Sequence, residues 1–390
     1  MFALLAGLLG ALIGSFANVV VWRMPRGESI VFPGSHCPRC NHRLGALDLV
    51  PILSWLALRG RCRYCRAAIP FRYPLVEVVM ALGFAGLAWR FPLELYGLTA
   101  LPLLALYALL VIASAIDLDH HILPDSLTLP ALAFALGATF VYEPASGLPT
   151  FAGALFGGAL GAGLIVLVNR LGGLVLRRFA DTQERLWPVG MDQVNLAALG
   201  GALYGWGLGL GLAGLSLLAS LATRKPLRLS EAAVYALWLG ALMLAALGLT
   251  VDVLTALGGS LVAAGGVAVL GAAYWWLRDL KTGEKPDADI AEEDDEPVAM
   301  GFGDVKLAAV LGAMLGWQSL LVALLLSFVL GAVGGVTATA LGGGRQVPFG
   351  PYLALGGVLA LLYGPALIRW YAGLLGVVQG PLLAFAGACI

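Results

Sequence analysis

The sequence predicts an all-α polytopic membrane protein with about twelve or thirteen transmembrane helices. Of its 390 residues, 60% are hydrophobic and 12% are charged, and the mean hydropathy is +0.90. Because an ordinary soluble domain carries about 25% charged residues, a chain this poor in charge could not cover its own surface in water. The composition excludes a disordered chain, a fibrous repeat, a disulfide scaffold and a cytosolic globular protein. It indicates a chain whose apolar surface faces the lipid bilayer.

The first apolar run, residues 1–22, has the length of a signal peptide but not its pattern. No charged region precedes it, and no small-residue cleavage site follows it. We therefore expect a retained first transmembrane helix with its N-terminus outside.

The next segment, residues 23–73, is rich in arginine. It holds nine arginines and two acids, Glu28 and Asp48, so the positive-inside rule predicts a cytoplasmic loop. The formal net charge of the whole chain is zero because acids gather elsewhere, chiefly in residues 287–296. That acidic stretch has too few apolar residues to pack, and it predicts a solvated loop.

Apolar stretches of spanning length follow along the rest of the chain. A first membrane part, residues 74–170, is followed by an inserted block, residues 171–297, and a second membrane part, residues 298–390. The expected spans are 74–91, 99–116, 127–142, 151–169, a hairpin over 190–222, 231–249, 253–277, a second hairpin over 304–341, 351–370 and a last helix ending at Ile390.

An internal repeat is visible within these spans. Residues 190–206 (GMDQVNLAALGGALYGW) match residues 301–317 (GFGDVKLAAVLGAMLGW), and residues 154–163 match residues 256–265 more loosely. The pattern predicts a duplicated block of four helices, although helices rich in Gly, Ala and Leu can also match by composition. The copies differ at one acid, because Asp304 is matched by Gln193, with Asp192 one place off.

Four cysteines in the arginine-rich loop form two C-x-x-C pairs, Cys37 with Cys40 and Cys62 with Cys65. Four thiolates in this spacing predict a closed tetrahedral zinc site, which would order a loop that has little core of its own. An iron–sulfur cluster and a pair of disulfides are the alternatives, and the cytoplasmic placement argues against disulfides. We expect Cys389, alone in an apolar segment, to be inert.

Aspartates stand at the ends of two apolar spans. Asp117 is nearest the body of its helix, and we expect Asp119 and Asp125 to be solvated loop residues, Asp125 capping the next helix. Asp304 lies among glycines, which let a backbone approach closely, although an acid at a helix N-terminus is also favoured by the helix dipole. Two carboxylates brought together cannot both ionise, so Asp117 and Asp304 could form an acid–base pair for activating water.

Three segments together resemble the type IV prepilin peptidase family. The first comprises GSFANVVVWRMPRGESIVFPGSHCPRC, PILSWLALRGRCRYC and IPFRYPLVE; the second is IDLDHHILPDSLTLP; the third is MGFGDVKLAAVLGAMLGW, followed by VPFGPYLALG. The resemblance covers residues 1 to about 170 and 298 to about 365, which leaves the inserted block outside the usual pattern.

The resemblance implies a bifunctional leader peptidase and N-methyltransferase. Asp117 and Asp304 would be the catalytic pair of a GxGD-type aspartic protease, and the four cysteines would hold structural zinc. S-adenosylmethionine would be the methyl donor, although no nucleotide-binding loop is recognisable; Asn18, Glu77 and Lys306 lie in matching motifs and could line substrate or methyl-donor contacts.

The same resemblance implies where the protein works and with what. Its partners would be prepilins or type II secretion pseudopilins, the lipid bilayer and the pilus or secretion machinery, but no nucleic acid. It would lie in the bacterial inner membrane with its active site at the cytoplasmic face. A transporter built on the internal repeat and an inactive pilus-assembly scaffold are the other hypotheses.

Overall fold

The computed structural model describes residues 1–176, 188–225, 230–282, 301–341 and 348–374. The acidic stretch 287–296, Cys389 and the expected last helix ending at Ile390 lie outside these ranges. The chain divides into two compact units, each treated separately below. The first comprises residues 1–127 and 137–148, and the second comprises residues 128–136 and 149–390.

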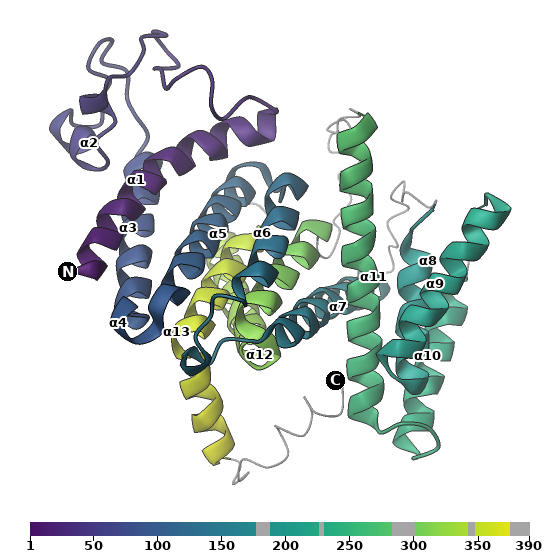
Figure 1. Ribbon diagram of the computed structural model, residues 1–390. Coiled ribbons are helices and arrows are strands. Elements are labelled where there is room, and N and C mark those ends of the chain that lie inside the picture. Colours follow the sequence, from purple (N-terminus) through teal and green to yellow (C-terminus); the bar gives the residue numbers. More distant parts are fainter. Residues whose placement is uncertain (177–187, 226–229, 283–300, 342–347, 375–390) are drawn as a thin grey trace. The chain divides into compact units, whose positions relative to one another are not determined.

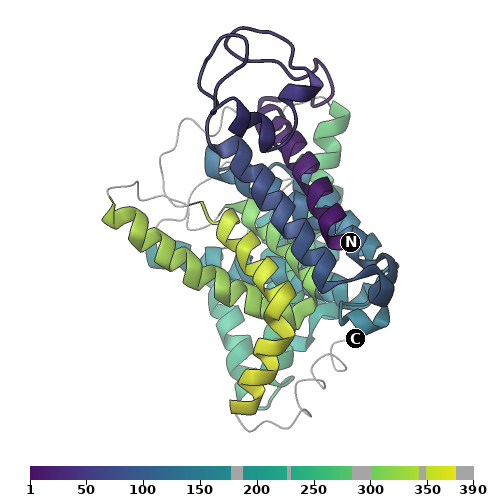
Figure 2. The same ribbon diagram turned by 90° about the vertical axis from the view of Figure 1, so that its left-hand side faces the viewer.

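Three long helices build the first unit: α1 Phe2–Arg23, α3 Arg72–Arg90 and α5 Ala100–His120. The helices α1 and α3 lie side by side (Figures 1 and 2). Glycines on α1 make close packing on α3 possible, because a Cβ added at Gly10 would lie 2.6 Å from the carbonyl oxygen of Met80. The third helix, α5, packs on both, and its Tyr107 hydroxyl donates a 2.9 Å hydrogen bond to the Val79 carbonyl oxygen. The shorter helices are α2 Leu53–Ala57 and α4 Leu93–Tyr96.

The arginine-rich segment forms a loop of about the predicted extent between α1 and α3. It contains the short α2 and two single 3-10 turns. Of residues 24–71, all described, only Cys37, Gly60 and Cys62 are buried, which confirms that this loop has almost no apolar core.

The second unit contains the repeat and the second aspartate. The helix α6, Asp125–Ala138, contributes residues to both units. The remaining helices are α7 Phe151–Leu176, α8 Met191–Tyr204, α9 Trp206–Thr223, α10 Glu231–Ala246, α11 Val253–Thr282, α12 Phe302–Ala340 and α13 Gly350–Leu374.

Both predicted hairpins are present, and each turns at a glycine. Gly205 separates α8 from α9 with φ 87° and ψ 175°, and Gly316 interrupts α12 with φ 72° and ψ 165°. A Cβ at Gly161 would lie 2.5 Å from the Ala308 carbonyl oxygen and 3.2 Å from Leu320 Cδ2. A straight helix would separate Ala308 and Leu320 by about 18 Å, so α12 folds back on itself at Gly316.

Equivalent contacts recur in the two copies of the repeat. Gly157 of α7 packs against Gly312 of α12, and their counterparts Gly259 of α11 and Gly201 of α8 pack in the same way, each glycine meeting the other's carbonyl group. The duplication predicted from the sequence is therefore also a duplication of helix packing.

The helices α7 and α11 also contact each other through matching residues. A Cβ at Gly163 would meet the carbonyl group of Leu261, and a Cβ at Gly265 would meet the carbonyl group of Ala159. Gly163 corresponds to Gly265, and Ala159 to Leu261, at the same spacing in the repeat. A contact in which each side repeats the other is the pattern of an interface with two-fold symmetry, so the two copies are related by an approximate two-fold axis.

Seven of the described helices are long and apolar enough to cross a membrane, and the chain is a multi-pass membrane protein. They are the helical segments Phe2–Arg26, Leu93–His120, Pro144–Gly172, Trp206–Thr223, Val253–Thr282, Phe302–Ala340 and Gly350–Leu374. The twelve or thirteen transmembrane helices expected from the sequence also included α3, α6, α8 and α10, and they counted α12 as two helices. Every expected span within the described residues coincides with one or two helices, although those expected over 127–142 and 231–249 end earlier, at Ala138 and Ala246.

Candidate functional site

The tetracysteine loop is built from two hairpins with the same backbone pattern. In the first, the Cys37 N–H donates to the His42 carbonyl oxygen (3.0 Å) and the Asn41 N–H to that of Cys37 (2.8 Å). The same bonds recur 25 residues later, from Cys62 to Ala67 (2.8 Å) and from Arg66 to Cys62 (3.0 Å). Asn41 and Arg66 also share a left-handed conformation, with φ 55° and 61°.

These hairpins place four thiols in one cluster. The Sγ atoms of the four cysteines all lie within 4.8 Å of one another, and Cys37 Sγ is 3.8 Å from Cys65 Sγ. A tetrahedral site with Zn–S bonds of about 2.3 Å has sulfur–sulfur edges of about 3.8 Å. The cluster therefore fits zinc.

The acidity of the thiols differs across the cluster. Burial raises the pKa of Cys37, but hydrogen bonds from the Cys40 and Arg39 backbones and from neighbouring thiols outweigh it and leave the pKa at about 7. At Cys65 a backbone hydrogen bond at Ala67 lowers the pKa, but burial and the neighbouring thiols raise it to about 11. The Cys37 thiol thus ionises near neutral pH, whereas ionisation of all four thiols requires a bound cation.

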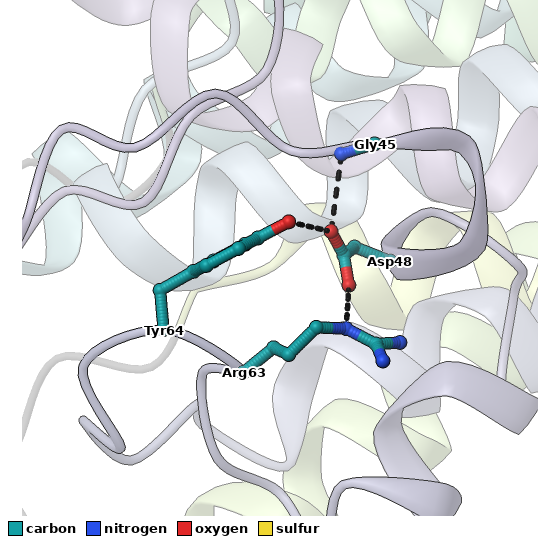
Figure 3. A network of polar contacts seen from close by, with 4 residues as sticks. All are labelled: Gly45, Asp48, Arg63 and Tyr64. Carbon is teal, nitrogen blue, oxygen red and sulfur yellow. Dashed lines mark hydrogen bonds and ion pairs between the residues drawn. The ribbon is translucent and has the colours of Figure 1, made fainter.

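A polar network ties the segment between the hairpins to the second hairpin (Figure 3). Asp48 accepts hydrogen bonds from Arg63 Nε (2.6 Å), the Tyr64 hydroxyl (3.1 Å) and the Gly45 N–H (3.1 Å). The hydrogen bond from the Arg63 guanidinium holds the pKa of Asp48 below its ordinary value. This loop is therefore ordered by polar contacts and by its thiols.

A second set of contacts holds the loop against the helices of the first unit. The Ile52 N–H donates a 2.7 Å hydrogen bond to Glu77 Oε2 in the first turns of α3, and Asn18 Nδ2 donates to the Tyr73 carbonyl oxygen at 3.2 Å. Glu77 is only 8% exposed. It is therefore not an ordinary solvated acid at a helix N-terminus.

The first aspartate motif occupies the end of α5. Asp117 is buried, 7% exposed, as expected for the acid nearest the helix body. Asp119 lies in the last helical turn and forms an ion pair with Arg72, the first residue of α3. Asp119 is exposed to solvent, as expected, but it lies in the helix rather than in a loop, and it is paired with Arg72. Asp125 begins α6, close to its expected place beside the start of that helix.

The second aspartate motif begins α12. Asp304 lies in its first turn, is 8% exposed, and donates its backbone N–H to the Gly301 carbonyl oxygen at 3.1 Å. Lys306, two residues on, is also buried. Asp304 belongs to the second unit and Asp117 to the first, so their pairing stays a prediction from the sequence.

Two contacts of the site were not predicted from the sequence, those between Arg72 and Asp119 and between Ile52 and Glu77. Each joins residues far apart in the chain. The available signal was the charge of Arg72, Glu77 and Asp119 at the borders of apolar spans, which indicates that each needs a partner but not which one.

Comparison with known families gives two matches along the chain. Residues 8–91 match the bacterial peptidase A24 N-terminal domain, and residues 104–224 and 228–336 match the type IV leader peptidase family. No solved structure matches the chain.

The similar proteins are named as enzymes that process prepilins. A prepilin leader peptidase/N-methyltransferase of Aeromonas salmonicida is 31% identical over 93% of this chain and 91% of its own. One of Myxococcus xanthus is 39% identical over 54% of this chain and 59% of its own. A type 4 prepilin-like proteins leader peptide-processing enzyme of Escherichia coli is 38% identical over 55% of this chain and 81% of its own.

Proposed function

Because the chain belongs to the type IV leader peptidase family, we propose that it is an aspartic endopeptidase that removes the leader of type IV prepilins or type II secretion pseudopilins. It also methylates the new N-terminal residue. The observation that carries the proposal is the burial of Asp117 and Asp304, each at the end of an apolar helix. Carboxylates are costly at such positions and are retained mainly for function.

In this reaction the two carboxylates share the acid and base roles. One, ionised, takes a proton from water, which attacks the scissile carbonyl carbon. The other, protonated, gives its proton to the leaving amine. Closely spaced carboxylates divide the roles in this way because the first to ionise disfavours ionisation of the second.

The protein acts in the bacterial inner membrane, with this chemistry at the cytoplasmic face. The arginine excess of residues 23–73 supports that orientation. That loop adjoins α3, and the Arg72–Asp119 pair links α3 to the Asp117 end of α5. The pilus or secretion machinery would take up the product.

Cys37, Cys40, Cys62 and Cys65 would hold one structural zinc ion, whose binding supplies folding free energy to a loop with almost no core. S-adenosylmethionine would supply the methyl group.

The peptidase assignment is tested by replacing each aspartate with asparagine. In membranes that contain a co-expressed prepilin, Asp117→Asn and Asp304→Asn should each abolish removal of the leader, measured by mass spectrometry of the pilin, while zinc content stays that of the wild type. Asp252→Asn, at an exposed acid of the second unit, is the matched control and should cleave normally. Continued cleavage by either catalytic variant would refute the pair.

The same measurement separates the other hypotheses. A transporter or an inactive scaffold would leave the leader in place in the wild type as well.

The zinc site is tested by metal analysis of the purified protein. Cys37→Ser removes one of four ligands and should lower bound zinc to a small fraction of the wild-type content, because one missing ligand opens the tetrahedral site. Cys389→Ser, outside the loop, should leave zinc unchanged. Full activity of a metal-free wild-type protein would refute the assignment of a structural zinc site.

A further inference from the structure

A pair of buried acceptors lies where the tetracysteine loop meets α1 and α3. Glu77 is 8% exposed and Asn18 is 5% exposed. Both residues lie next to Gly14 of α1. Asn18 Nδ2 donates to the Gly14 carbonyl oxygen (3.2 Å), and a Cβ added at Gly14 would lie 2.8 Å from Glu77 Cα.

Asn18 Oδ1 lacks a hydrogen-bond donor, and the Glu77 carboxylate lacks a cationic partner among the described residues. The Asn18 Oδ1 atom is buried with no hydrogen-bond partner. The Glu77 carboxylate accepts hydrogen bonds from the Ile52 N–H and the Ser15 hydroxyl, but no cationic side chain among the described residues forms an ion pair with it. Because buried carboxylates are ordinarily paired and buried carbonyl oxygens ordinarily bonded, these two acceptors together are suited to a ligand that brings positive charge and several N–H donors.

One of the two donors to Glu77, the Ile52 N–H, belongs to a residue in a strained backbone conformation. Ile52 has φ 63° and ψ −52°, a region that β-branched residues rarely adopt, and such strain concentrates at functional sites.

We propose that Glu77 and Asn18 bind the new α-amino group of the cleaved substrate and form the amine site of the methylation step. This inference rests on the proposed function. An ammonium group carries one positive charge and three N–H donors, which matches one carboxylate and one unpartnered amide oxygen.

The reaction follows from that placement. Glu77 accepts one proton from the ammonium group and leaves a neutral amine. The nitrogen lone pair then attacks the sulfonium-bound methyl carbon of S-adenosylmethionine, an N–C bond forms as the C–S bond breaks, and a neutral thioether leaves. The second N–H proton is lost to solvent from the methylated ammonium.

The first test compares methylated with cleaved product for Glu77→Gln, measured by intact-mass spectrometry of a co-expressed prepilin. Glutamine keeps an acceptor for the Ile52 N–H but cannot take the proton, so the ratio of methylated to cleaved product should fall by about 10²-fold or more. Residual methylation should rise with pH, because solvent then deprotonates an amine whose pKa is ordinarily near 8. Glu94→Gln, at an exposed acid of the same unit, should leave the ratio and its pH profile unchanged.

The second test measures binding without a methyl donor. A synthetic peptide with the free N-terminus of the cleaved pilin should bind the wild-type protein in detergent at least about tenfold more tightly than it binds Glu77→Gln or Asn18→Leu, because each variant removes a partner of a buried charged group. The same peptide with an acetylated N-terminus should bind all three proteins equally weakly.

The outcomes separate this inference from the peptidase proposal. Normal methylation by Glu77→Gln, equal binding of the free and acetylated peptides, or a wild-type protein that cleaves without methylating would each refute the amine site and leave the peptidase standing. Loss of zinc and of cleavage in Glu77→Gln would also refute it, because Glu77 would then serve only to hold the loop. Failure of the wild type to cleave would refute the proposed function itself.

Discussion

Single charged residues at the ends of α3 and α5 connect the tetracysteine loop to Asp117, the first of the two aspartates that we propose as catalytic. Arg72 begins α3 directly after the loop, and Asp119 lies two residues beyond Asp117. The two side chains are 33% and 28% exposed, respectively. At that exposure an ion pair stabilises a fold by about 1 kcal/mol or less, so its main effect is on position.

We predict that Arg72→Gln and Asp119→Asn each lower the rate of leader removal severalfold, while the melting temperature in detergent hardly changes. The reason is that either change releases the end of α5 that carries Asp117. The exchange of the two charges, Arg72→Asp with Asp119→Arg, should recover much of the rate.

Arg59→Gln, at an exposed arginine of the loop, controls for a general loss of positive charge and should cleave normally. Equal rates for the single variants and the wild type would show that the ion pair has no part in positioning Asp117.

Among the elements, the two helix hairpins depend on glycine for their turns. Gly205 and Gly316 have positive φ with ψ near 170°, a region that is essentially restricted to glycine because a Cβ would clash with the backbone. The dipeptide Gly-Trp recurs at both turns, so the repeat preserves the turn together with the helices.

We predict that Gly205→Ala and Gly316→Ala each lower the free energy of unfolding by about 1–3 kcal/mol, seen as a lower melting temperature in detergent. Gly207→Ala, two residues from the first turn, is the control. Its Cβ would meet nothing within 4 Å, so the higher helix propensity of alanine should leave stability unchanged or raise it by up to about 1 kcal/mol. A Gly316→Ala protein as stable as the wild type would contradict the role of this glycine.

The positions of the helices could be predicted from the sequence because each is encoded locally. The run expected at 99–116 is α5, Ala100–His120, and the hairpin expected over 190–222 is α8 with α9. The partners of Glu77 and Asp119 could not be predicted in the same way, since Ile52 and Arg72 reach them only through the fold of the whole loop. Hydrophobic periodicity specifies which face of a helix is buried, but not which distant polar group meets it.

At the scale of the whole molecule, the repeat gives the second unit two copies of the segment that carries Asp304. The contact between α7 and α11 is made by equivalent residues on both sides, as in a symmetric dimer. The helix α11 thus packs on α7 through the residues that correspond to those it contacts.

The copy over residues 190–206 has no acid at the position that matches Asp304. Gln193 stands where Asp304 stands in the other copy, and it is 2% exposed. Its Oε1 accepts a 2.8 Å hydrogen bond from the Gly190 N–H, and its Nε2 lies 3.4 Å from the Ser216 hydroxyl. The glutamine therefore links the two helices of the hairpin, α8 and α9, whereas Asp304 is the residue that we propose for the reaction.

We predict that an aspartate restored in the inserted block does not restore activity. The sequence holds two counterparts of the Asp304 motif but a single copy of the motif IDLDHHILPD that carries Asp117, and an acid–base pair requires one of each. Gln193→Asp combined with Asp304→Asn should therefore remain as inactive in leader removal as Asp304→Asn alone. Gln193→Asp alone should cleave normally and lose stability, because a shorter charged side chain replaces a satisfied amide in a buried place. Recovery of cleavage in the double variant would show instead that the two copies are interchangeable, and that the inserted block is a second working half-site.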